Sequence, residues 1–162
     1  MRSLRLLTLL ALLSAGLLSG CQTTNKWEGI QSSKMAAATA EGIRAEAPGD
    51  YYIGRRYYKN DYKFWGYVRR PGEPWANAKL VMLNESSKLA PDRELGRLGS
   101  DNGYEYKLLG DFSGDTVYEP ASNGFYPEFV LKNYELRSAA PGSIFRTAGA
   151  LDPSRRIIVR PN

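Results

Sequence analysis

Short apolar and aromatic segments separated by turn residues constrain the fold of this chain more than any other feature. From Asp50 to Leu136 this punctuation is typical of β-strands rather than of long helices. The expected strands are Tyr51–Tyr58, Tyr62–Arg69, Lys79–Asn84, Tyr104–Leu109, Thr116–Glu119, Glu128–Leu136 and, after a flexible segment at 138–153, Arg156–Arg160. We therefore expect a mostly β domain over residues 50–162, built as a small bent sheet or barrel of five to seven strands, because closure protects sheet edges.

The residues between these segments support turns. The breaks are Pro71-Gly72, Asp101-Asn102-Gly103, Ser113-Gly114-Asp115 and Ser122-Asn123-Gly124. Each supplies a residue that tolerates a positive φ angle. Residues 88–98, with Pro91-Asp92 as a start signal, are expected to form a short helix or a long loop. The strand count favours an OB-like or SH3-like barrel.

The first residues carry a different signal. Arg2 and Arg5 precede the thirteen-residue segment Leu6–Leu18, which is apolar except for two hydroxyl residues and a glycine, and Leu18-Ser19-Gly20-Cys21 follows. This order and spacing resemble the lipobox signal peptide of bacterial lipoprotein precursors. The resemblance implies that residues 1–20 are removed and that the Cys21 sulfur receives a diacylglyceryl group, after which its freed amine is acylated. If the host has two membranes, it further implies the outer membrane, because Gln22 stands where an aspartate would favour inner-membrane retention. We expect the domain to face the periplasm rather than the cell surface.

A transmembrane anchor and an ordinary secretory signal fit this leader less well. A transmembrane anchor needs about 20 apolar residues, and thirteen fall short. An ordinary secretory signal prefers small residues at the first and third positions before the cut, whereas Leu18 would occupy the third. Three acyl chains would anchor the protein more firmly than one chain, which binds only reversibly.

Residues 21–49 are polar and alanine-rich, with few apolar side chains. Ile30, Met35 and Ile43 are too sparse to form a convincing helical stripe. We expect a lipidated tether with a fraying helix, which ends at Pro48-Gly49. The alternative is a helix that packs on the domain.

The absence of histidine excludes several kinds of chemistry. The chain has no His and a single Cys, so Ser-His-Asp and Cys-His nucleophile systems and His/Cys zinc sites are not expected. No cofactor or metal is predicted. An enzyme would depend on paired carboxylates, a Ser-Lys pair or tyrosine.

Aromatic and basic residues concentrate between Tyr51 and Arg70. Six cations and one acid give this stretch a net charge of +5, which indicates a charged face. The candidate binding face consists of Arg55, Arg56, Lys63, Trp65, Tyr67 and Arg69, while Phe64 and Val68 should face the core. The simplest alternative is a hairpin whose arginines cover cross-strand tyrosines. Possible ligands are peptidoglycan, anionic lipid head groups or an envelope protein, and nucleic acid is not expected outside the cytoplasm.

These features together predict a lipid-anchored, non-enzymatic binding or scaffolding module of the cell envelope. The alternative is a small carboxylate-based hydrolase of cell-wall glycan, which needs two acids about 5 to 9.5 Å apart. The acids in or near loops are Asp92, Glu94, Asp111, Asp115, Glu119 and Glu128. Calcium binding at 111–115 is not expected, since the spacing of a calcium loop is absent.

Overall fold

The computed structural model describes residues 26–162, with side chains from residue 30 onward. The predicted signal peptide and Cys21 lie outside this range. The elements are α2 (Lys26–Arg44), β1 (Tyr52–Arg56), β2 (Gly66–Arg69), the 3₁₀ turn η2 (Trp75–Asn77), β3 (Lys79–Asn84), α3 (Pro91–Glu94), β4 (Glu105–Glu119) and β5 (Gly124–Ser138). Among these described residues, no helix is long and apolar enough to cross a membrane.

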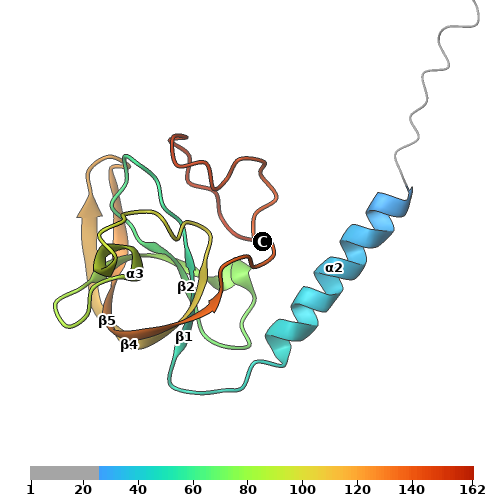
Figure 1. Cartoon of the computed structure of the whole chain (residues 1–162), viewed down its shortest axis with the longest axis horizontal. Helices are drawn as coiled ribbons and strands as arrows, with labels where there is room; N and C mark the ends of the chain where they lie inside the picture. The colour runs from blue at the N-terminus through green and yellow to red at the C-terminus, as the bar shows by residue number, and fades with distance from the viewer. Residues whose placement is uncertain (1–25) are drawn as a thin grey trace, which may run out of the picture. The chain divides into compact units, whose positions relative to one another are not determined.

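The five strands close into a barrel in the order β1-β2-β3-β5-β4. Figure 1 shows this barrel. All neighbouring strands pair antiparallel except β3 and β5, which are parallel. This confirms the small mostly β barrel. Of the two expected types, the connectivity is OB-like, with α3 inserted between β3 and β4.

The two longest strands contain a feature that was predicted as a turn. Tyr104–Leu109 and Thr116–Glu119 are parts of the single strand β4, because residues 113–115 form an irregularity within it. The strand-to-strand register shifts between Phe112 and Thr116, and Gly114 has a φ of 94°. A bulge of this kind bends a strand without ending it. The prediction of two strands here is therefore wrong.

Side chains from the barrel strands form two cores rather than one. Tyr52 and Val68 face the barrel interior with residues from β3, β4 and β5. Their chain neighbours Ile53 and Tyr67 belong to a second cluster on the outer wall, which also contains Phe145. Because successive strand residues point to opposite sides, β1 and β2 are buried on both faces.

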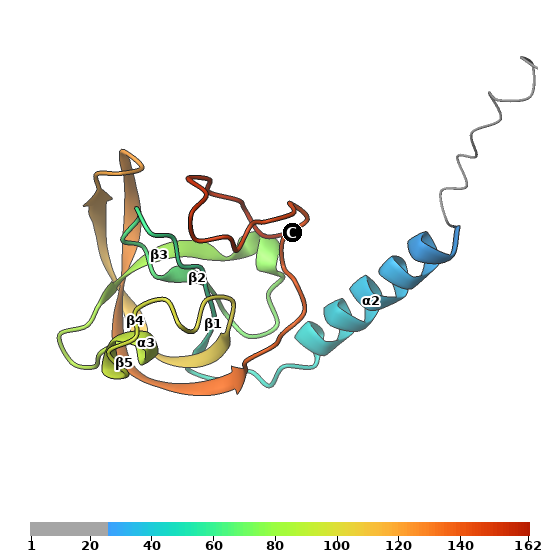
Figure 2. The same cartoon turned by 45° about the horizontal axis from the view of Figure 1, so that its top comes forward.

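The C-terminal segment 139–162 covers that outer wall (Figure 2). The Tyr57 hydroxyl donates to the Ile157 carbonyl over 2.9 Å, and the Tyr67 hydroxyl donates to the Val159 carbonyl over 2.9 Å. The Lys59 ammonium donates to the Ala150 carbonyl over 2.7 Å. The prediction of a strand at 156–160 is wrong, because these residues form no strand. The segment 138–153, which was expected to be flexible, has no regular secondary structure after β5 but contributes Ile144, Phe145 and Ala150 to the second core.

The boundary of the domain also differs from the prediction. The compact unit that contains the barrel runs from Thr39 to Asn162, rather than from Asp50. Ile43 packs against the second core, and α2 is continuous to Arg44. Residues 39–49 therefore belong to the domain and not to a tether.

Candidate functional site

The predicted binding face is not an exposed surface. Of its six residues, Arg55, Arg56, Trp65, Tyr67 and Arg69 are at most 4% exposed, and Lys63 alone lies at the surface. The physical reason is the double coverage of β1 and β2 by the barrel interior on one side and the C-terminal segment on the other. The prediction of a solvated aromatic-basic face is wrong for these five residues, while Phe64 and Val68 are buried as predicted.

Three of the six residues nevertheless meet at a cavity of about 570 Å³. Arg56, Lys63 and Trp65 line it, whereas Arg55, Tyr67 and Arg69 lie elsewhere. The loop from β1 to β2 forms one wall, the end of β3 forms another, and the segment that contains α3 completes it. Its other lining residues are Tyr58, Asn60, Tyr62, Phe64, Met82, Leu83, Glu85, Ala90, Asp92, Arg93 and Leu98.

Arg56 is the centre of a buried charge cluster beside the cavity. Its guanidinium donates to the Asp92 carboxylate over 2.8 Å and lies 3.3 Å from the Asp101 carboxylate. It also donates to the Trp65 carbonyl. The guanidinium carbon lies 5.2 Å from the centre of the Tyr58 ring. One cation is thus held between two carboxylates and an aromatic wall.

The two carboxylates differ in their pKa. Burial raises the pKa of Asp92. The Arg56 charge and the Gly99 amide, which donates a hydrogen bond to the Asp92 carboxylate, lower this pKa by more, so that it lies below its ordinary value. Burial dominates at Asp101, and the neighbouring Asp92 charge adds to it, so the pKa of Asp101 is raised despite Arg56. Asp92 therefore carries the negative charge that balances Arg56.

Three buried polar atoms of cavity residues have no hydrogen-bond partner within the described part of the chain. They are the donors Nε of Arg56 and Nε1 of Trp65, and the acceptor Oδ1 of Asp92. Leaving such a group unsatisfied costs about 1 to 3 kcal/mol.

The charges that line the cavity leave an excess of one cation. Asp92 balances Arg56, and the Glu85 carboxylate lies 2.9 Å from the Arg93 guanidinium. Within residues 30–162, Lys63 forms no ion pair with any of these acids. The ring of Tyr62 packs 5.1 Å from that of Phe64, which gives the mouth an aromatic edge beside the free ammonium group.

The acids predicted for a hydrolase do not converge. Asp111 is exposed and pairs with Lys132 over 2.7 Å, and buried Glu119 accepts from the Ser122 amide in its own turn. Asp92 is the one member of that set at the cavity. In the described region, no group of three or more Asp, Glu, Cys or His residues could hold a metal ion.

Sequence reasoning missed part of this site. It took Asp92 as a helix start and placed Asp101 in a turn, although both contact Arg56. A buried arginine demands a carboxylate partner, but the sequence did not indicate that Arg56 is buried. Glu85, which accepts from the Ala90 amide over 2.5 Å, was also not predicted.

A comparison of the chain with family models, curated proteins and solved structures found no match.

Proposed function

We propose that this protein is a lipid-anchored, non-enzymatic binding module of the bacterial cell envelope. The anchor is Cys21 in the lipobox, and the protein is held on the periplasmic side of the outer membrane. The ligand enters the cavity between the β1–β2 loop and α3. This moves the predicted binding site from an open strand face to the mouth of the barrel.

The observation that supports this proposal best is the composition of the cavity wall. Aromatic residues (Tyr58, Tyr62) line the same cavity, of about 570 Å³, as Lys63, whose ammonium forms no ion pair within residues 30–162. Ligand sites are typically concave and largely apolar, with a few polar groups that fix orientation, and they occur in the mouths of β-barrels.

The lining favours a glycan that carries an acidic group, as in peptidoglycan. Aromatic rings can pack against the apolar faces of sugars, and the ammonium of Lys63 attracts a carboxylate. OB-like barrels in general bind oligosaccharides through the β2–β3 face and the β1–β2 loop. That argument rests on analogy of fold and adds to the argument from the residues.

A hydrolase is less favoured, although Glu85 and Asp92 both line the cavity. A general acid needs a raised pKa, whereas the pKa of Asp92 is lowered. Glu85 is held by Arg93 and by the Ala90 amide. Both carboxylates are committed to neighbouring groups of the protein.

Titration calorimetry of the full-length chain in detergent with soluble peptidoglycan fragments tests the proposal. We expect saturable binding that weakens with salt, because screening reduces the attraction of an exposed charge. Lys63→Gln should weaken binding, and Lys34→Gln, at an exposed position of α2, should not. Mass spectrometry of the recovered fragments should find them intact. Binding that is unaltered in Lys63→Gln would contradict the site, and cleaved fragments would favour the hydrolase.

Vesicles with anionic lipids are the comparison ligand in the same assay. Preference for vesicles over the glycan fragments would transfer the proposed ligand class to lipid head groups. Absence of binding to both would leave a protein partner and contradict a glycan site.

A further inference from the structure

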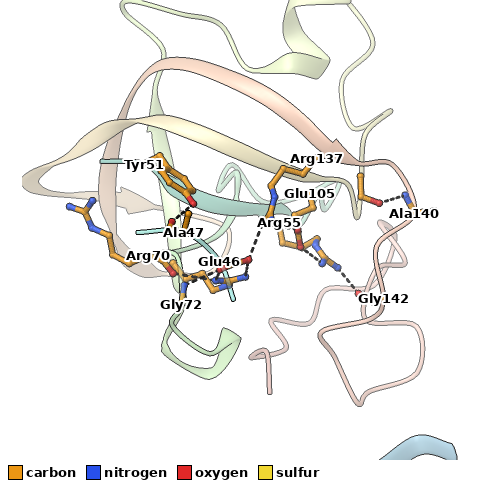
Figure 3. Close-up of polar contacts among 12 residues, drawn as sticks. Glu46, Ala47, Tyr51, Arg55, Arg70, Gly72, Glu105, Arg137, Ala140 and Gly142 are labelled. Carbon is orange, nitrogen blue, oxygen red and sulfur yellow. Dashed lines mark hydrogen bonds and ion pairs between the residues drawn. The ribbon is translucent and has the colours of Figure 1, made fainter. Parts of the chain in front are cut away.

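The side chain of Glu46 is held by the barrel although it lies in the segment that leads from α2 to β1. Its carboxylate accepts two hydrogen bonds from Arg69, over 2.6 and 2.8 Å, and one from Arg137 over 3.0 Å. The Gly72 amide donates a further one over 3.0 Å. Figure 3 shows the contacts from Arg137 and Gly72 converging on the Glu46 carboxylate, whose side chain is 7% exposed.

The groups that hold Glu46 come from separate elements of the barrel. Arg69 ends β2, Arg137 is near the end of β5, and Gly72 lies in the turn after β2 with a φ of 80°. Trp75 supports Arg69, with the guanidinium carbon 4.5 Å from its ring centre. Packing against the ring restricts the guanidinium, so the donors are positioned by the fold.

Charge also favours a carboxylate at this position. Arg55, Arg69 and Arg137 form one network, and Glu105 is their other acid, 2.6 Å from Arg55 and 3.2 Å from Arg137. Without Glu46 the network would hold three cations and one anion. Burial raises the pKa of Glu46, but Arg69, the Gly72 amide and Arg137 lower it more strongly, to about 2. The carboxylate is therefore ionised at neutral pH.

We propose that Arg69, Arg137 and the Gly72 amide form a carboxylate-binding site of the barrel, separate from the cavity, and that Glu46 is its resident ligand. Residues 45–50 are then held by recognition of one side chain. Ala47 assists, since its carbonyl accepts from the Tyr51 hydroxyl over 2.5 Å. The site fixes where the chain that leads to the lipid anchor leaves the barrel, and it accepts other carboxylates when Glu46 is removed.

Chemical rescue of Glu46→Ala in the full-length chain tests this site. Acetate contains the two carbons and two oxygens that alanine lacks relative to glutamate, and acetamide is its uncharged counterpart. The substitution should lower the melting temperature by about 5 to 10 °C, since it removes hydrogen bonds to charged groups. Acetate should raise the melting temperature of Glu46→Ala, and the increase should follow the logarithm of the acetate concentration, as for any ligand that binds only the folded state. Acetamide and sodium chloride should have little effect.

The matched control is Glu41→Ala, at an exposed position of α2. It should melt like the wild type and should not respond to acetate. Adding Arg137→Gln to Glu46→Ala should weaken the acetate response. If Glu46→Ala does not fold, Glu46→Gln, which keeps the shape and loses the charge, tests the charge directly: it should melt below the wild type and should not respond to acetate, because its amide fills the site.

Equal melting of Glu46→Ala and the wild type would overturn the proposal. Equal rescue by acetate and acetamide would also overturn it, as would an equal acetate response in Glu41→Ala.

Discussion

Replacing Arg56 by glutamine should destabilise the protein far more than replacing an exposed arginine. Arg56 is 4% exposed and is the cation shared by Asp92 and Asp101, which are 0% and 3% exposed. Glutamine removes the charge and shortens the side chain, so it leaves two buried acids without their cation. On the exposed binding face that the sequence predicted, the same change would cost less than about 0.5 kcal/mol.

The size of the effect follows from this burial. Removing one partner of a buried ion pair costs about 3 to 5 kcal/mol, mostly because the other charge is left unpaired. Loss of the contacts of the guanidinium with the Tyr58 and Trp65 rings adds to it. In a domain of this size each kcal/mol lowers the melting temperature by about 3 to 5 °C. We therefore expect a fall of about 10 to 20 °C.

Urea unfolding followed by tryptophan fluorescence measures this difference. The control is Arg156→Gln, since Arg156 is 76% exposed in its pair with Asp61 and should change stability by less than about 0.5 kcal/mol. Adding Asp101→Asn to Arg56→Gln should recover part of the lost stability, because it removes one of the two buried acids that no longer face a cation. If Arg56→Gln and Arg156→Gln unfolded at the same urea concentration, the buried charge cluster would be refuted.

Four further results are expected. Phe64→Ala should cost about 3 to 5 kcal/mol in urea unfolding, and Phe125→Ala, at a 70% exposed position, less than about 0.5 kcal/mol; equal costs would contradict the second core. Tyr67→Phe should cost about 1 kcal/mol and speed amide hydrogen exchange in residues 157–160, and unchanged exchange would show that the hydroxyl does not hold this segment. The pKa of Glu46 is lowered from 4.5 to about 2 in the folded chain, so the unfolded state binds more protons between these pH values and stability should be lost as the pH falls through this window. An equal loss of stability in Glu46→Gln would contradict the assignment to Glu46. Cys21→Ala should abolish lipidation, and mass spectrometry of the wild-type membrane form should find a modified Cys21, whereas an unmodified thiol would contradict the lipobox.

Local sequence signals predicted the barrel well. The strand Lys79–Asn84 begins and ends where it was predicted to, because polar and turn-forming residues flank its apolar residues on both sides. Gly72, Gly103, Gly114 and Asn123 all have positive φ angles, as expected from their chemistry. These features depend on the few residues on either side, so the sequence alone is sufficient to predict them.

Burial of the basic residues depends on distant parts of the chain and was not predicted. The side chains of β1 and β2 alternate between two faces, and the sequence analysis placed one of these faces in solvent, as in an ordinary antiparallel sheet. Ile144 and Phe145, in a segment with no regular pattern, cover that face. The cavity contains Arg56, Lys63 and Trp65 from the predicted set, but their acidic partner Asp92 lies 36 residues from Arg56, and no local pattern links the two.

The dependence of the outer core on the end of the chain has a consequence for the timing of folding. The hydroxyl of Tyr57 bonds to a carbonyl 100 residues later, so the last part of the chain must be made before this core can close. At about 5 to 20 residues per second, translation of that interval takes about 5 to 20 s. Such long-range contacts also slow folding itself. During this period the chain lacks the contacts that close its outer core, so the barrel strands made first expose apolar side chains such as Ile53 and Tyr67 until the C-terminal segment covers them.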